Sequence, residues 1–148
     1  MNQPRTGIAA RESSSHPRPA AATVADVMRP PPTTVHQHDH AAAAAYLMKH
    51  TGTTALMVMD ARAGQPANII TAADIARAIA DGKDANEVWV DAVMSARPAI
   101  TTTTSIRDAA QIMTTRHFRH LPVAGDAGLV GIVDIIDVCQ ALIDAGEG

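Results

Sequence analysis

The sequence predicts an α+β fold in which two β-α-β-β-α repeats pack sheet to sheet about a pseudo-twofold axis. The first observation is a duplication: VADVM at 24–28 returns as VDAVM at 90–94, 66 positions later, and a proline follows each copy. The second is that the same succession of strand-like and helix-like hydrophobic patterns follows both copies. Because a half of about 60 residues buries too little surface to fold alone, the two halves are expected to share a core.

The chain divides into three segments. Residues 1–22 mix Ser, Pro, Arg and Ala without a hydrophobic period, so we expect them to form a flexible tail. Residues 23–83 are predicted to form the first repeat, and residues 84–148 the second.

Each element of the repeat follows from a local pattern. In the first repeat, a β-branched stretch at 33–35 predicts a strand, and small or apolar residues at helical spacing predict the next helix: Ala41, Ala44, Ala45 and Met48. The hydrophobic runs 55–60 and 67–71 predict two further strands, and a helix after Thr71 would turn three residues toward the core: Ile75, Ala78 and Ile79. The second repeat has the matching strands at 100–102, 120–125 and 130–134, and matching helical positions at Ile106, Ala109, Ala110, Met113, Val138 and Leu142.

Composition and charge exclude several classes of protein. The net charge is −3 and the 12 Lys and Arg are scattered, which argues against a nucleic-acid partner. No apolar run reaches the roughly 18 residues that span a bilayer, and no hydrophobic signal core begins the chain, so we expect a cytoplasmic protein without a membrane partner. The single cysteine, Cys139, lies among apolar residues and is expected to pack as a small hydrophobic side chain.

Thr71 and Asp74 stand three positions apart where a predicted strand runs into a helix. This spacing is that of a capping box, in which the threonine oxygen and the aspartate carboxylate each accept a backbone N–H at the helix start. The same helix start also presents free N–H groups and a positive dipole end to an anion. The residues alone leave both interpretations open.

The duplicated segments resemble the cystathionine β-synthase (CBS) domain, whose tandem pair is called a Bateman module. The resemblance is carried by VADVM, VDAVM, NIITAADI at 68–75 and HLPVAGDAGLVGIVDIIDV at 120–138, and it covers residues 24 to about 145. It implies a regulatory, non-enzymatic protein that senses an adenosine-containing ligand, of the AMP, ADP, ATP or S-adenosylmethionine class, between its repeats. It also implies a homodimer and no cofactor.

The family grips its nucleotide with a motif of the form Gly-h-x-h-Thr/Ser-x-x-Asp, where h is hydrophobic, and the resemblance therefore implies two clefts. The first would combine Thr71 and Asp74 with four residues of the second repeat: Ile100, Phe118, Arg119 and His120. The second would combine Asp134 and Asp137 with three residues of the first repeat: Thr34, Thr53 and Thr54.

The two clefts depart differently from the family motif. The first has Asn68 in place of the glycine, whereas the second keeps Gly131 but has Asp134 where Thr or Ser is expected. Because Asp134 would repel a phosphate, we expect the first cleft to bind the nucleotide and the second to stay empty or to take a ligand without phosphate.

Three alternatives remain open from the sequence. Thr71 and Asp74 can be a helix cap alone, and RHFRH at 116–120 a solvated strand edge, in an interaction module that binds an unidentified protein and no small ligand. His36, His38 and His40 alternate along an extended segment and could bind a metal, although Asp39 there is also a natural N-cap for the following helix. Trp89 suits either packing between repeats or a dimer surface.

Overall fold

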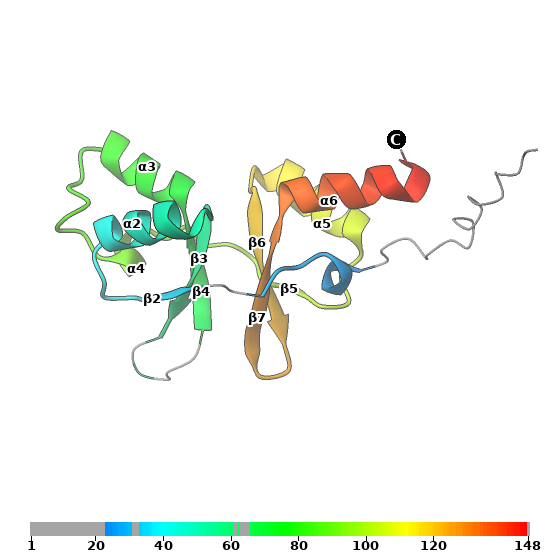
Figure 1. Cartoon of the computed structure of the whole chain (residues 1–148), viewed down its shortest axis with the longest axis horizontal. Helices are drawn as coiled ribbons and strands as arrows, with labels where there is room; N and C mark the ends of the chain where they lie inside the picture. The colour runs from blue at the N-terminus through cyan, green and yellow to red at the C-terminus, as the bar shows by residue number, and fades with distance from the viewer. Residues whose placement is uncertain (1–22, 31–32, 61, 63–65, 148) are drawn as a thin grey trace, which may run out of the picture.

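The computed structural model of the chain describes residues 23–30, 33–60, 62 and 66–147, so the predicted tail at 1–22 lies outside the described residues. The molecule has two halves that lie side by side (Figure 1). Each half contains one three-stranded sheet, with the strand orders β2-β3-β4 and β5-β6-β7. In both sheets the first pair of strands is parallel and the second antiparallel.

The strands follow the two predicted sets closely. The first sheet is formed by β2 (Thr34–His36), β3 (Ala55–Met59) and β4 (Pro66–Thr71). The second is formed by β5 (Ile100–Thr101), β6 (His120–Gly125) and β7 (Gly128–Asp134).

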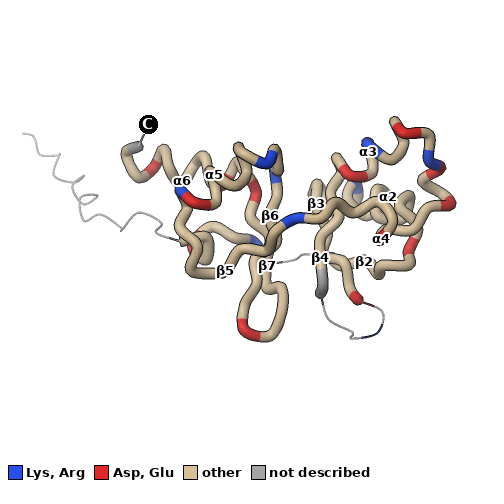
Figure 2. The backbone as a smooth tube through the Cα atoms, turned by 180° about the vertical axis from the view of Figure 1, so that it is seen from behind, with Lys and Arg blue, Asp and Glu red and all other residues tan. Residues whose placement is uncertain are grey.

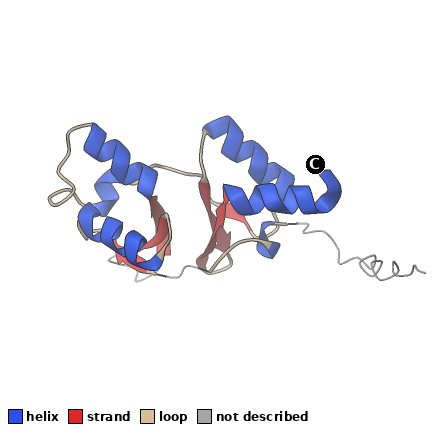
Figure 3. Ribbon diagram, turned by 45° about the horizontal axis from the view of Figure 1, so that its top comes forward, coloured by secondary structure: helices blue, strands red, loops and turns tan. Residues whose placement is uncertain are grey.

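The helices complete the β-α-β-β-α order in each half. Helices α2 (Ala41–Thr51) and α3 (Ala72–Ala80) belong to the first half, and α5 (Ile106–Arg116) and α6 (Ile135–Leu142) to the second. Shorter helical segments are η1 (Val24–Asp26), α4 (Val90–Val93) and η2 (Ile143–Glu147). Figure 3 shows the strands of both halves at the middle of the molecule and the helices outside them. The predicted α+β fold of two repeats packed sheet to sheet is confirmed.

A cluster of apolar side chains joins the two sheets. Ala55, Met57 and Ile69 of the first sheet form one buried cluster with Ile132 of the second, and Leu129 packs against it. Each half also has a cluster of its own between its sheet and its helices. The shared cluster explains why the halves pack through their sheets.

The two segments that precede the repeats pack against opposite halves. Val24 of η1 is fully buried in the cluster of the second half, whereas Val90 and Val93 of α4 are buried in the cluster of the first. The chain therefore crosses between the halves after each segment, once before β2 and once before β5. The boundary predicted between residues 83 and 84 stays a prediction.

Helices α2 and α5 both end at a residue in the left-handed conformation, but only the first of these residues is a glycine. The two residues are Gly52, with φ 72°, and His117, with φ 60°. A side chain other than glycine adopts this region at a cost of about 1–2 kcal/mol. His117 is thus held in a strained conformation just before β6.

Some details differ from the sequence prediction. Ala45 and Ile79 are exposed because their helices turn only a narrow stripe toward the sheet, and Cys139 is exposed for the same reason. The N-cap of α2 is His40 rather than Asp39, because the Asp39 carboxylate accepts the backbone N–H of His36 at 2.9 Å instead.

The sequence predicts neither a membrane-spanning helix nor a basic stripe for nucleic acid. Within the described residues, no helix has the length and apolar character that a membrane span requires. Figure 2 shows basic and acidic positions spread over both halves of the backbone rather than gathered in one stripe.

Candidate functional site

Thr71 and Asp74 form the capping box that their spacing predicts. The Asp74 N–H donates to Thr71 Oγ1 at 3.2 Å, and the Thr71 N–H donates to Asp74 Oδ2 at 3.0 Å. Both residues are buried, with 2% and 1% of their surface exposed. The cap fixes the first turn of α3 directly at the end of β4.

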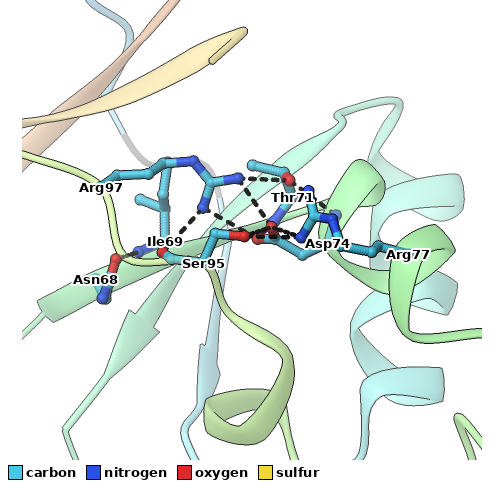
Figure 4. A network of polar contacts seen from close by, with 7 residues as sticks. All are labelled: Asn68, Ile69, Thr71, Asp74, Arg77, Ser95 and Arg97. Carbon is cyan, nitrogen blue, oxygen red and sulfur yellow. Dashed lines mark hydrogen bonds and ion pairs between the residues drawn. The ribbon is translucent and has the colours of Figure 1, made fainter. Parts of the chain in front are cut away.

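A guanidinium from the segment that precedes β5 covers this capping box. Arg97 donates to Asp74 through Nη1 to Oδ2 at 3.0 Å and through Nη2 to Oδ1 at 2.9 Å, and Nη2 also donates to Thr71 Oγ1 at 3.1 Å. The Ser95 hydroxyl donates to Asp74 Oδ1 at 2.6 Å, and Arg77 donates to the same oxygen at 3.4 Å. Figure 4 shows these groups converging on the Asp74 carboxylate.

The environment of Asp74 keeps its carboxylate charged. Burial raises the pKa of Asp74, but hydrogen bonds from Arg97, Ser95 and the Thr71 N–H together lower it below the ordinary value of 3.8. Because only 4% of the Arg97 side chain and none of the Asp74 side chain is exposed, this is a buried ion pair.

The second half contains a matching pair at its own motif. Arg29 donates to Asp137 through Nε at 2.8 Å and Nη2 at 2.9 Å. Asp134 is the N-cap of α6 and accepts the Ile136 N–H at 2.8 Å. Unlike Arg97, Arg29 is largely exposed, with 71% of its side chain accessible.

Steric contacts explain why the second repeat has a glycine at position 131. A Cβ at Gly131 would lie 2.9 Å from the Arg29 carbonyl oxygen and 3.1 Å from Met28 Sδ. The backbone of Arg29 exchanges two hydrogen bonds with Ile132 beside it, at 2.9 and 3.0 Å. Gly131 therefore lets the segment that carries Arg29 approach β7 closely.

One pocket of about 520 Å³ lies where the two halves meet, and we call it the inter-repeat pocket. Its lining comes from both halves: Thr54, Thr71, Ala72, Ala73, Arg77, Arg97, Arg116, His117, Phe118, Arg119, His120, Asp134 and Ile136. The inter-repeat pocket thus contains residues of both predicted sets: Thr71, Phe118, Arg119 and His120 from the first, and Thr54 and Asp134 from the second.

The remaining predicted residues do not line the inter-repeat pocket. Asp74 lies behind Arg97, and Asp137 is paired with Arg29. Ile100 is buried in the core of the second half, Thr34 is exposed on β2, and Thr53 exchanges a hydrogen bond of 3.1 Å with Thr51.

The inter-repeat pocket is strongly basic. Four arginines line it, against one acidic residue, Asp134; two of the four, Arg77 and Arg97, pair with Asp74 behind the pocket. The Arg97 and Arg116 guanidinium groups lie over the Phe118 ring, 5.3 and 5.8 Å from its centroid. The first turn of α3 adds the positive end of a helix dipole. This combination suits a ligand that carries phosphate.

Arg97 and Ser95 were not predicted from the sequence as site residues. The signal that could have found Arg97 is a second repetition: Arg29-Pro30 precedes the first strand of the first repeat, and Arg97-Pro98 precedes that of the second. Each arginine stands just before the chain crosses to the other half.

His120 lines the inter-repeat pocket and forms a contact between the two halves. Its Nε2 shares a hydrogen bond of 2.9 Å with the Thr54 hydroxyl and lies 3.5 Å from Asp134 Oδ2. Burial lowers the pKa of His120 from 6.5; Asp134 opposes that effect, and nearby Arg97 and Arg119 reinforce it. The neutral imidazole is therefore favoured in the folded chain.

We expect stability to fall as the pH drops below about 6.5, because the unfolded chain then binds a proton at His120 that the folded chain resists. His120→Gln should flatten this part of the profile, since glutamine does not titrate. Urea unfolding of both proteins between about pH 7 and pH 5 measures the difference. An unchanged slope in the variant would assign the acid sensitivity to other groups.

One of the three alternating histidines, His38, has other partners. The His38 ring lies against the Trp89 ring, with 4.3 Å between centroids and a tilt of 40°, and its Nε2 lies 3.4 Å from Asp91 Oδ2. In the part of the chain that the structure describes, no group of three or more His, Cys, Asp or Glu side chains is placed to bind a metal ion.

The comparison with known families decides what this arrangement is. The model of the CBS domain family matches the chain twice, over residues 24–81 and 90–144. The chain belongs to the CBS domain family. The resemblance noted in the sequence is confirmed, and the two halves are a CBS-domain pair.

Similar proteins include both a longer protein and isolated pairs. The meiotically up-regulated gene 70 protein of Schizosaccharomyces pombe is 36% identical over 108 residues, which are 72% of this chain but only 15% of that protein. The CBS-domain containing protein ATU1752 from Agrobacterium tumefaciens is 27% identical, with a TM-score of 0.72 over 84% of this chain and 96% of that one. The CBS domain pair of protein MJ0100, solved with 5′-methylthioadenosine and S-adenosyl-L-methionine, is 25% identical, with a TM-score of 0.71 over 88% of this chain and 100% of that one.

Proposed function

We propose that this CBS-domain pair is a regulatory, non-enzymatic module that binds an adenosine nucleotide in the inter-repeat pocket. The observation that carries the proposal is the set of basic side chains that both halves contribute to one pocket, beside the capped start of α3. Support also comes from the MJ0100 pair, whose structure contains two adenosine derivatives. Binding between the halves would bias their relative position, which is how such a module can signal.

A thermal-shift screen of AMP, ADP, ATP, adenosine and S-adenosylmethionine tests the proposal. A ligand that prefers the folded chain raises its stability by about RT ln(1 + [L]/Kd), so the phosphorylated ligands should raise the melting temperature most. Arg116→Ala should weaken AMP binding by about tenfold to a hundredfold, since a charged hydrogen bond contributes about 1.5–3 kcal/mol. Lys83→Ala, a lysine outside the pocket, is the matched control.

The absence of any thermal shift with all five compounds would favour the alternative, an interaction module without a small ligand. One observation supports that alternative: Arg97, a side chain of the protein itself, already fills the acceptor sites of Asp74. The two functions therefore differ in whether a ligand can displace Arg97.

We propose that the protein acts as a homodimer. Large apolar side chains are exposed on helices of both halves: Tyr46 at 61%, Ile79 at 55%, Ile136 at 62% and Ile143 at 58%. A second copy would remove this surface from water. Light scattering should give twice the chain mass of 15.5 kDa at micromolar concentration, and a mass of one chain would contradict the proposal. The cytoplasm, which the lone free thiol of Cys139 suits, is the proposed location.

A further inference from the structure

We propose that Arg97 makes the inter-repeat pocket selective for ligands that carry both a vicinal diol and a phosphate. Arg97 holds Asp74 until a phosphate offers the guanidinium another partner, and only then can ligand hydroxyls bind Asp74. This inference rests on the proposed function, because it concerns the choice of ligand in the same pocket.

The Asp74 carboxylate has no acceptor site left. Its Oδ1 accepts from Arg97, Ser95 and Arg77, and its Oδ2 accepts from Arg97 and the Thr71 N–H. A carboxylate offers about four lone-pair positions, so these bonds use all of them. A ligand hydroxyl can bind Asp74 only if one of the present donors leaves.

Arg97 is the donor whose departure frees both carboxylate oxygens, since Arg77, which also lines the pocket, donates to Oδ1 alone at 3.4 Å. Arg97 lines the inter-repeat pocket, whereas the Asp74 side chain behind it is fully buried. Its Nε is buried without a hydrogen-bond partner, so its present position leaves one donor unsatisfied. An anion in the pocket would supply the partner that Nε lacks.

A ribonucleotide carries the groups that can exchange partners with Arg97 and Asp74. Two adjacent hydroxyl groups, such as those of a ribose, can donate to the two carboxylate oxygens that the guanidinium now occupies, although they do not replace its charge. The displaced guanidinium in turn binds phosphate in the same bidentate manner. A ribonucleotide brings both groups at once, whereas a nucleoside would leave Arg97 without a partner.

The second half shows that the arrangement recurs. Arg29 and Asp137 form the matching bidentate pair, and each arginine precedes a proline at a crossing between the halves. The Arg29 pair is open to solvent, with 71% of the Arg29 and 22% of the Asp137 side chain exposed, while the Arg97 pair is almost fully buried. Only the buried pair is costly to open without a replacement partner.

Calorimetric titration of AMP and adenosine into the wild type and Arg97→Ala tests the inference. The wild type should bind AMP about a hundredfold or more tightly than adenosine, since opening a buried ion pair without compensation costs that factor or more. In Arg97→Ala the AMP-to-adenosine ratio should fall at least about tenfold, because adenosine binds more tightly once the competing guanidinium is gone.

Two controls separate competition from a simple enlargement of the pocket. Arg97→Ala combined with Asp74→Asn should lose the gain in adenosine affinity, because the carboxylate that accepts the diol is absent. Arg29→Ala, at the matching exposed pair, should leave the ratio of the wild type unchanged. If Arg97→Ala does not fold, Arg97→Gln provides the second measurement, since its amide still donates one bond to Asp74.

The outcomes are distinguishable. If the wild type binds AMP but adenosine does not bind more tightly to Arg97→Ala, the selectivity inference is overturned and the proposed function stands. If neither compound binds the wild type or Arg97→Ala, the proposed function itself fails, and the inference fails with it. Tighter adenosine binding that disappears with Asp74→Asn supports both.

Discussion

Replacing Asp74 with alanine is expected to lower the free energy of unfolding by about 3–5 kcal/mol. The substitution removes the carboxylate from a guanidinium of which only 4% is exposed, so a buried positive charge loses its ion-pair partner. It also removes the acceptor for the Thr71 N–H at the start of α3. Urea unfolding followed by circular dichroism measures the change.

Asp137→Ala is the matched control for this prediction. It removes a bidentate ion pair of the same chemistry, but the partner Arg29 has 71% of its side chain exposed. Exposed ion pairs contribute about 0–1 kcal/mol, so the control should change stability by no more than that. Equal losses in both variants would show that burial of the Arg97 pair does not set its contribution.

A double substitution tests the cause further. Removing Arg97 together with Asp74 leaves no buried charge unpaired, since 56% of the Arg77 side chain is exposed, so the double variant should be less destabilised than the sum of the two single variants. A purely additive result would mean that the two side chains stabilise the chain through separate contacts.

The fold could be predicted because its signals are local and duplicated. The spacing of Ile106, Ala109 and Met113 indicates a buried helix face by itself, and all three are buried in the structure. The capping box at Thr71 and Asp74 is likewise a contact between residues three positions apart. Periodicity of this kind reports secondary structure reliably where an element has one apolar face.

The site could be predicted only in part, because its decisive contacts join distant positions. Arg97 reaches Asp74 across 23 positions, and His120 reaches Thr54 across 66. No pattern near Arg97 indicates a buried side chain, since a charged residue before a proline reads as an exposed loop. The family motif names Asp74 as a ligand-binding residue but contains no position for the arginine that covers it.

The mixed lining of the inter-repeat pocket, which contains residues from both predicted clefts, has the same origin. Thr54 and Asp134 were assigned to one cleft and Thr71 and His120 to the other, by analogy with two separate sites. In the structure the starts of α3 and α6 both face the inter-repeat pocket, and the bond between Thr54 and His120 joins the two sets. Which side chains share a pocket depends on how the sheets pack, and strand patterns do not encode that angle.

Because the sheets pack through Ile69, we expect Ile69→Ala to lower the free energy of unfolding strongly. Ile69 is fully buried and belongs to the cluster with Met57 and Ile132 that joins the two halves. Removing its side chain beyond Cβ leaves a cavity that rigid strands on both sides cannot fill, so the expected loss is about 2–5 kcal/mol. The loss should be one cooperative transition, because neither half buries enough surface to remain folded alone.

Its neighbour provides the control. Ile70 is equally buried but points to the other face of β4, into the cluster of the first half alone. Ile70→Ala should cost a similar amount, yet it should add to Ile132→Ala within about 0.5 kcal/mol, whereas Ile69→Ala should couple with Ile132→Ala by about 0.5–3 kcal/mol. Urea unfolding of the single and double variants gives both sums. Coupling at Ile70 rather than at Ile69 would place the contact between the repeats on the opposite face of the sheet. The inter-repeat pocket would then not be formed by the packing described above.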